Sequence, residues 1–531
     1  MKHLIIAACL ALIMLAGGLA AGRAQASGPG PDLCPALAPP TGPTITVSTL
    51  SELENAVNNA SPGDVILIAD GVYNLDGVYL RIDTPNVTLR SASGHREDVV
   101  LDGNYITTEI IQIVASDVTI ADLTLREAYD HPIHVMSTSN ADVTGTLIYN
   151  VHIIDPGQQA IKINPYTGEN ALYFPDDGVV ACSHIELTDA GRPHIRDNCY
   201  TGGVDAHQAR DWVIRDNIIE GFWCDNGLSE HGVHFWRASR DTLVARNLLR
   251  NNARGVGFGL STSGSGLRTY DDNPCPAAGG SYVDHYGGVI RNNFIFANES
   301  ALFASEYGFD SGIGLWNACG ARALHNTVAS TQAPFSSIEW RFDNTDADII
   351  NNLVTHNLMD RGGTATLSGN LQNQPLSTFV DGPGGDLHLS ASATAAIDQV
   401  NAPADVTDDF DGEARPIGSA SDVGADEYDP DQLYFPIIFI ATRGSSDLTL
   451  SWRIDQPWQA FRVYRDVAPY FEPEGAPVAT LTALPWRWID PDALGDAAVN
   501  HFYLVQGDDN DAVVTSQRVG EFDFALTPGE E

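Results

Sequence analysis

A short pattern of apolar and polar residues recurs along the chain, most clearly in 203-GVDAHQA-209 and 232-GVHFWRA-238. Successive side chains of a strand face opposite sides, so the residues between paired apolar positions should share one outward face. Aligning the repeats predicts two outward columns: His134, Lys162, Asp205, His234, Gly257, Gly314 and Glu339, and then Met136, Asn164, His207, Trp236, Gly259, Trp316 and Arg341. Acidic, basic and aromatic side chains would share this face, with glycines opening a gap among them. We predict that it carries the active site.

The lysine in the first column is one of only two in the chain, Lys2 and Lys162. Arginine stays protonated at ordinary pH, whereas a desolvated lysine can be tuned toward neutrality. Lys162 is therefore a candidate proton acceptor, although an arginine-rich chain can also retain one lysine without a function.

The elements that would position these columns are short strands that recur with an asparagine-rich turn, as in 213-VIRDN-217, 244-VARN-247 and 289-VIRNN-293. Repeats of this size cannot bury a core individually, so they indicate a solenoid. Before them, residues 48–57 have capping-box spacing and an amphipathic helical pattern. Insertions at about 165–200 and 261–287 would form walls beside the columned face.

The segment from Pro62 to Tyr73, followed by 87-VTL-89 and 99-VVLDG-103, resembles the opening of pectate-lyase-like right-handed parallel β-helix proteins, especially the chondroitinase B and alginate lyase group. The resemblance implies an all-β chain. We expect a right-handed parallel β-helix over residues 45–430, closed by an N-terminal capping helix. Residues 408–428 resemble the closing segment of such proteins and are predicted to cap the last coil.

That resemblance also implies a chemistry, the β-elimination of a uronate-containing polysaccharide. Elimination needs a cation to neutralise the carboxylate, a base for the C5 proton and an acid for the leaving oxygen. By resemblance Lys162 is the expected base, with His234 as the second choice and His207 beside them. Asp205 would orient His234 or ligate Ca²⁺. The expected substrate-binding residues are Trp236, Arg237, Trp316, Glu339 and Arg341.

Two other functions remain open. A glycoside hydrolase or epimerase on the same fold would use the carboxylates of Asp205, Glu230 and Glu339. An inverting pair should be about 6.5–9.5 Å apart, whereas Asp205 and Glu339 are four aligned coils apart, roughly 19 Å. Glu230 could instead swing toward Asp205, which keeps hydrolysis open. A non-catalytic protein could instead bind sugars through Trp236 and Trp316. Paired histidines and acids also permit a metal site, although the HxH-like spacing occurs only across coils and is a weak signal. The adjacent Glu230-His231 pair is expected to be a solvated loop pair.

The N-terminal residues 1–26 have the pattern of a cleavable secretory signal, and no later segment is long and apolar enough for a membrane helix. We therefore expect a secreted monomer whose partner is a polysaccharide. The formal net charge of −41 argues against nucleic acid, which normally demands a basic face. Six cysteines remain after the signal, an even number that suits disulfides, and we predict that Cys182 pairs with Cys199.

From Leu433 the pattern changes to alternating strands separated by turn residues, such as 448-LTLSW-452, 461-FRVYR-465 and 501-HFYLV-505. These strands resemble a fibronectin type III β-sandwich, and the length of residues 433–526 suits such a module. All the candidate site residues precede it.

Overall fold

The structure is a computed structural model that describes residues 33–168, 171–264 and 267–429. Further on it describes residues 440–443, 448–451, 460–467, 473, 475–482, 487–490, 501–508 and 513–515. The predicted signal at residues 1–26 lies outside the described residues.

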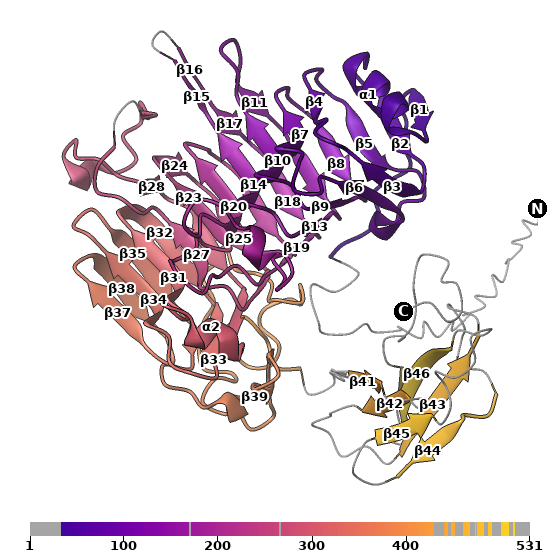
Figure 1. The fold of residues 1–531 in the computed structure, drawn as a ribbon. Helices are drawn as coiled ribbons and strands as arrows, with labels where there is room; N and C mark the ends of the chain where they lie inside the picture. Colours follow the sequence, from indigo (N-terminus) through magenta and orange to yellow (C-terminus); the bar gives the residue numbers. More distant parts are fainter. Residues whose placement is uncertain are drawn as a thin grey trace, which may run out of the picture.

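Three long parallel sheets form a right-handed parallel β-helix, because each turn of the chain adds one strand to each sheet (Figure 1). The first sheet contains β1 (Thr44–Val47), β2 (Val65–Ile68), β5 (Thr88–Ser91), β8 (Thr119–Ala121), β12 (Leu147–Tyr149), β18 (Val179–Ala181), β21 (Val213–Arg215), β25 (Leu243–Ala245), β29 (Val289–Arg291), β32 (Ala318–Leu324), β35 (Asp346–Ile350) and β38 (Thr364–Ser368). In the same sheet β28 (His285–Tyr286) pairs with β32, and β24 (Ser239–Arg240) pairs with β28. The second contains β3 (Gly71–Asn74), β6 (Val99–Asp102), β9 (Thr124–Arg126), β13 (His152–Ile154), β19 (His184–Glu186), β22 (Ile218–Glu220), β26 (Leu248–Arg250), β30 (Phe294–Ala297), β33 (Thr327–Ser330) and β36 (Leu353–Val354).

The third sheet carries the predicted columns, and we call it the site sheet. Its strands, in spatial order, are β4 (Leu80–Ile82), β7 (Glu109–Ile113), β10 (His131–Met136), β14 (Gln159–Asn164), β20 (Gly202–His207), β23 (Val233–Trp236), β27 (Arg254–Phe258), β31 (Ser311–Trp316), β34 (Ser336–Arg341) and β37 (Leu358–Arg361). Shorter elements lie outside the three sheets. They are β11 (Val143–Thr144), β15 (Tyr166–Thr167), β16 (Leu172–Tyr173), β17 (Pro175–Asp176), α2 (Ser300–Ala304), β39 (Phe379–Asp381), β40 (Asp386–Leu389) and the 3₁₀ turns Arg96–Asp98, Arg192–His194, Pro276–Ala278 and Leu376–Thr378.

The predicted N-terminal helix is confirmed as α1 (Leu50–Asn58), which packs against β1, β2 and β4 at one end of the stack. Thr49 is its N-cap and accepts a hydrogen bond from the Glu52 amide, while the Glu52 carboxylate accepts one from the Ser48 amide at 2.8 Å. These two bonds satisfy donors that a helix start leaves unpaired. The apolar face of α1 is buried and closes the first coil.

Inside the coils, apolar side chains stack into one continuous core, and an asparagine ladder runs along one turn. Asn247 donates through Nδ2 to Oδ1 of Asn293 at 2.9 Å, and Asn293 donates in the same way to Asn326 at 2.9 Å. The ladder includes Asn217 and Asn352 as well. Buried polar groups need such partners, so the asparagine-rich turns have the stacking role expected from the sequence.

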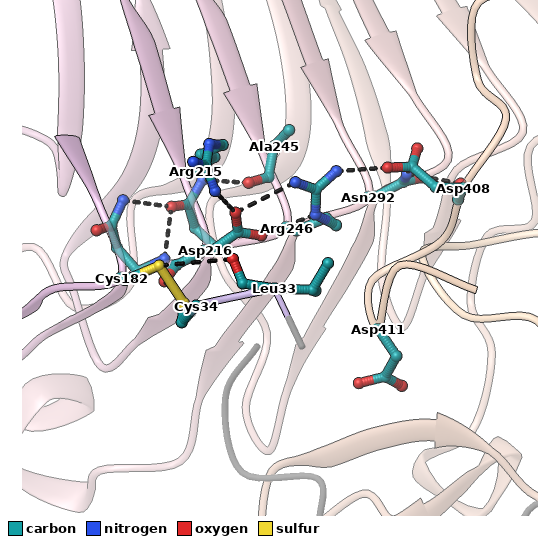
Figure 2. Close-up of polar contacts among 12 residues, drawn as sticks. Leu33, Cys34, Cys182, Arg215, Asp216, Ala245, Arg246, Asn292, Asp408 and Asp411 are labelled. Carbon is teal, nitrogen blue, oxygen red and sulfur yellow. Dashed lines mark hydrogen bonds and ion pairs between the residues drawn. A yellow bond between two sulfur atoms is a disulfide. The ribbon is translucent and has the colours of Figure 1, made fainter. Parts of the chain in front are cut away.

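The disulfides differ from the predicted pairing of Cys182 with Cys199. Cys182 bonds to Cys34 across 148 residues, and Cys199 bonds to Cys224. A third bond joins Cys275 to Cys319. Figure 2 shows the first bond beside Asp216, at a turn of the stack. The prediction is wrong because Cys182 lies at the end of the first-sheet strand β18, whereas Cys199 directly precedes the site sheet.

Residues 379–428 pack along the side of the stack. Phe379, Leu387 and Phe410 cover Phe294 and Phe296 of β30 on the outer face of the second sheet. At the neighbouring turn, the Asp408 carboxylate accepts hydrogen bonds from Arg246 and Arg291. Figure 2 shows the bond from Arg246 and the one that the Asp408 carbonyl accepts from Asn292. The prediction that this segment caps the last coil is therefore wrong. Arginines at the same turn position of successive coils, Arg246 and Arg291, hold the acidic segment laterally.

The C-terminal strands form two antiparallel sheets among the described residues. One has β41 (Ile440–Arg443), β42 (Leu448–Ser451) and β45 (Arg487–Asp490), and the other has β44 (Ala479–Leu481), β43 (Ala460–Asp466), β46 (Phe502–Asp508) and β47 (Val513–Thr515). The fibronectin type III resemblance stays a prediction. Within the described residues, none of the helices has both the length and the apolar character needed to span a bilayer.

Candidate functional site

The first predicted column lies on the site sheet in the predicted register, and three pairs of the second column do as well, while Gly259 directly follows β27. The first column pairs residue by residue: His134 with Lys162, Lys162 with Asp205, Asp205 with His234, His234 with Gly257, Gly257 with Gly314 and Gly314 with Glu339. In the second column, Met136 pairs with Asn164, His207 with Trp236, and Trp316 with Arg341. Neighbouring strands are about 4.8 Å apart, so the side chains that bear chemistry are stacked in close succession.

Lys162 and Asp205 form a buried ion pair at the centre of this stack. Lys162 is 4 % exposed and Asp205 is 1 % exposed. Burial acts to lower the pKa of Lys162, but the carboxylate of Asp205 and the hydroxyl of Tyr200 raise it above its ordinary value. The expectation that desolvation tunes Lys162 toward neutrality is wrong, because its partner carboxylate outweighs the burial. Lys162 is a cation at neutral pH and is therefore a poor base.

Asp205 is held on both of its oxygens. Oδ2 accepts from Lys162, and Oδ1 accepts from the indole Nε1 of Trp236 at 2.8 Å. Burial acts to raise the pKa of Asp205, but Lys162 and the adjacent histidines hold it well below its ordinary value. The carboxylate is therefore ionised and serves as the anchor of the cluster.

His234 lies behind Asp205 and is fully buried. Its Nε2 lies 3.2 Å from the carbonyl of Gly259, while Nδ1 lies 3.4 Å from Asp205 Oδ1 and 3.0 Å from Glu230 Oε2. Burial acts to lower the pKa of His234, but the two carboxylates raise it to about 9. Among the described residues, Asp205 thus lies beside His234 as expected. Burial of the imidazole keeps it from reaching a substrate directly.

His207 is a partly exposed titratable group of the cluster, with 18 % of its side chain accessible. Its Nε2 lies 3.5 Å from Asp205 Oδ2 and 3.4 Å from Lys162 Nζ. Burial lowers its pKa below 6.5, with Lys162 and Arg237 acting in the same direction against Asp205. His207 is therefore neutral at pH 7 and can accept a proton.

Tyr200 belongs to the cluster although the sequence did not single it out. Its hydroxyl accepts a hydrogen bond from Lys162 Nζ at 3.1 Å. Burial and Asp205 raise its pKa, so the phenol keeps its proton at neutral pH. The disulfide between Cys199 and Cys224 fixes the chain directly before Tyr200. In the sequence, the feature that could have pointed to Tyr200 is its place directly after Cys199 at the end of a predicted insertion.

The glycines of the first column do not open a gap. A Cβ at Gly257 would lie 2.5 Å from Nε2 of His231, and one at Gly314 would lie 2.9 Å from Cε2 of Trp316. The two ring side chains fill the space that the missing side chains leave. The predicted opening is wrong because neighbouring aromatic side chains fold over the glycines.

Trp316 and Glu339 are not available to a sugar. Trp316 is 2 % exposed and donates through Nε1 to Glu339 at 2.6 Å. Glu339 is fully buried and also accepts from Ser336 at 2.8 Å and from Arg361 at 2.7 Å. Their predicted direct contact with substrate is therefore not supported, because each side chain is already used within the protein. Trp236, by contrast, remains partly exposed beside Arg237.

Three arginines on or next to the site sheet have no carboxylate partner among the described residues, unlike the other arginines of the β-helix. Over the described part of residues 33–429, every arginine except Arg81, Arg237 and Arg341 forms an ion pair with a described carboxylate. Arg81 and Arg341 lie on β4 and β34 of the site sheet, and Arg237 directly follows β23. From β4 to β34 there are eight strand spacings, roughly 38 Å. These cations form a line that suits an extended anion.

Calcium does not fit the residues of this sheet. Ca²⁺ takes six to eight oxygen ligands, whereas both oxygens of Asp205 are occupied by Lys162 and Trp236. Every described group of three or more potential metal ligands contains histidine, and the one at the site sheet is Glu230, His231 and His234. Imidazole nitrogen suits transition ions and not Ca²⁺.

Comparison with known proteins does not assign the chain to a family. No protein-family model matches the chain, and no curated protein sequence matches it. Among solved structures, it is similar to an alginate lyase from Paenibacillus sp. str. FPU-7 at 16 % identity, covering 62 % of this chain and 98 % of that one with a TM-score of 0.40. It is also similar to pectate lyase Pel9A at 12 % identity, covering 71 % and 90 % with a TM-score of 0.46. A polygalacturonase from Erwinia carotovora ssp. carotovora is 12 % identical, with coverage of 64 % and 98 % and a TM-score of 0.30.

Proposed function

We propose that the chain is a secreted lyase that binds an acidic polysaccharide along the site sheet and cleaves it by β-elimination. The observation that carries the proposal is the line of arginines without carboxylate partners, Arg81, Arg237 and Arg341, on either side of the Lys162–Asp205 cluster. In a chain of net charge −41, an unpaired cation is uncommon. Three on one face favour a ligand with several negative charges at polymer spacing.

In this proposal His207 is the base. The tautomer with hydrogen on Nε2 donates toward Asp205 and leaves Nδ1 to accept the C5 proton of a bound uronate. The electron pair of that C–H bond forms the C4–C5 double bond as the C4–O bond breaks. Tyr200 donates its phenolic proton to the departing oxygen. Such a base or acid typically contributes about 10²–10⁴-fold in rate.

Lys162 has an electrostatic role in this scheme. Its ammonium group is hydrogen-bonded to the Tyr200 oxygen, so it stabilises the phenolate that remains after proton donation. Arg237 lies beside Trp236 and near His207, where it would neutralise the uronate carboxylate. Neutralising that carboxylate makes the C5 proton more acidic. This is needed because imidazole is a weak base.

Hydrolysis by paired carboxylates receives less support. Asp205 and Glu339 are both buried and both hydrogen-bonded within the protein. They are also four strand spacings apart on the site sheet, which exceeds the separation an inverting pair requires.

The proposal is tested by incubating the protein with alginate, pectate, chondroitin and a heparin-like polysaccharide, with and without a chelator. Elimination creates an unsaturated uronate whose ultraviolet absorbance increases with time. Hydrolysis would release reducing ends without that absorbance, and such a result would overturn the lyase assignment. Binding without either product would leave the chain a carbohydrate-binding protein.

A further inference from the structure

Three potential metal ligands gather beside β23, and each has an atom without a hydrogen bond among the described residues. The ligand atoms of Glu230, His231 and His234 lie within 4.8 Å of one another. The buried atoms that lack a hydrogen bond include Glu230 Oε2, His234 Nδ1 and both ring nitrogens of His231. A buried polar atom normally has a partner, so the two unsatisfied ring nitrogens of His231 beside the Glu230–His234 ion pair indicate a missing ligand.

His231 is the clearest of the three. Its side chain is fully buried, and neither ring nitrogen has a hydrogen-bond partner in the described chain. The ring lies under Gly257, where any Cβ would collide with it, and Trp316 packs against it edge-on at 5.2 Å. Burying an imidazole without hydrogen bonds is unfavourable. An apolar ring would fill this space without that cost.

His234 is oriented as a metal-binding histidine would be. Its Nε2 lies 3.2 Å from the carbonyl of Gly259 and donates to it. With no ion bound, the two carboxylates keep a proton on Nδ1, and a metal ion would take the place of that proton. Histidine ligands commonly donate their second nitrogen in this way, which fixes the tautomer and the ring direction. Nδ1 lies 3.0 Å from Glu230 Oε2 but is not aligned with it for a hydrogen bond.

Glu230 is held in place from outside the group. Its backbone amide donates to the carbonyl of Thr201 at 2.8 Å. The loop that leads to it is tied to the start of β20 by the disulfide between Cys199 and Cys224. Its carboxylate side chain is 16 % exposed, so an ion could enter from the solvent side.

We propose that Glu230 Oε2, one ring nitrogen of His231 and Nδ1 of His234 bind a transition ion of the zinc type. Two imidazoles and one carboxylate are a known donor set for Zn²⁺, which leaves a fourth position open to water. The site adjoins Asp205 but does not require the lyase chemistry, so it stands independently of the proposed function. Its bound ion would fix the loop that carries Glu230 against the site sheet.

A second histidine group in the β-helix provides a matched control. His152, His184 and Glu186 also lie within 4.8 Å of one another, on the outer face of the second sheet. There His152 Nε2 already pairs with Glu186 at 2.8 Å, and His184 Nε2 pairs with Glu220 at 2.8 Å. These residues satisfy one another without an ion.

The test uses the full chain, stripped with a chelator, loaded with Zn²⁺ or Co²⁺ and dialysed. We expect stoichiometric zinc by mass spectrometry, visible ligand-field bands with Co²⁺, and a higher melting temperature with either ion. His231→Phe and Glu230→Gln should lose retained zinc and the Co²⁺ bands, whereas His184→Gln should keep both. Glu230→Gln, at a partly exposed position, decides the question if His231→Phe fails to fold. Absence of retained ion in the wild type, or its loss only in His184→Gln, would overturn the proposal.

Discussion

Replacing Lys162 by Met should destabilise the β-helix without changing the size of the side chain greatly. Lys162 and Asp205 are 4 % and 1 % exposed, so the substitution leaves a buried carboxylate without its cation. Removing one partner of a buried pair costs about 3–5 kcal/mol. The remaining hydrogen bond from Trp236 to Asp205 keeps the cost from being larger.

This free energy converts into a modest shift of melting temperature because the β-helix is large. Unfolding entropy is about 2.1 cal/mol/K per residue, or about 0.8 kcal/mol/K for roughly 400 residues. Lys162→Met should therefore lower the melting temperature by about 4–6 °C. Scanning fluorimetry at a single scan rate measures the shift, since a chain of this size need not unfold reversibly.

The shift should be independent of pH across the neutral range. The pKa of Lys162 is raised, so its contribution is present below its unfolded value of about 10.5 and is lost as pH rises through the folded value. The pKa of Asp205 is lowered, so its contribution is present above about 3.8 and is lost as pH falls through the folded value. Between about pH 5 and pH 9 both groups are charged in both states.

A control variant separates this effect from loss of charge alone. Arg322 pairs with Asp405 at the surface, where their side chains are 30 % and 52 % exposed. Such pairs contribute about 0–1 kcal/mol, so Arg322→Met should shift the melting temperature by about 1 °C or less. Equal shifts for Lys162→Met and Arg322→Met, or no shift for Lys162→Met, would refute the assignment of a buried ion pair.

Three further outcomes are expected. His207→Gln should lose about 10²–10⁴-fold in turnover, whereas His152→Gln, on the second sheet, should keep the wild-type turnover. Because burial lowers the pKa of His207, wild-type kcat/KM should fall only below about pH 6.5. Arg341→Gln should raise KM for an acidic polymer about 2- to 5-fold at low salt with kcat unchanged, and added salt should remove the difference. Asn293→Ala should lower the melting temperature by several degrees, since each buried group left unpaired costs about 1–3 kcal/mol.

The repeat and its register could be predicted from the sequence for a local reason. Side chains alternate along a strand, and each coil must bury its apolar pair against the next. Pairing Val204 with Val233 therefore also pairs Asp205 with His234, as the structure shows. The asparagine ladder follows from the same stacking, because residues at one turn position of successive coils must be neighbours.

The partners of the polar side chains depend on loops and side-chain directions that no repeat specifies. Tyr200 reaches Lys162 only because an insertion ends there and Cys199 is bonded to Cys224. Trp316 turns back over Gly314 and buries Glu339, which converts a predicted sugar contact into a core interaction.

The sequence by itself determined which residues share the site sheet, because period-two alternation and coil stacking follow from backbone geometry. Only the tertiary structure decided their protonation, because a pKa depends on burial and on the nearest charge. Lys162 illustrates the division: its place beside Asp205 followed from the repeat, whereas its raised pKa follows from the carboxylate against which it is buried.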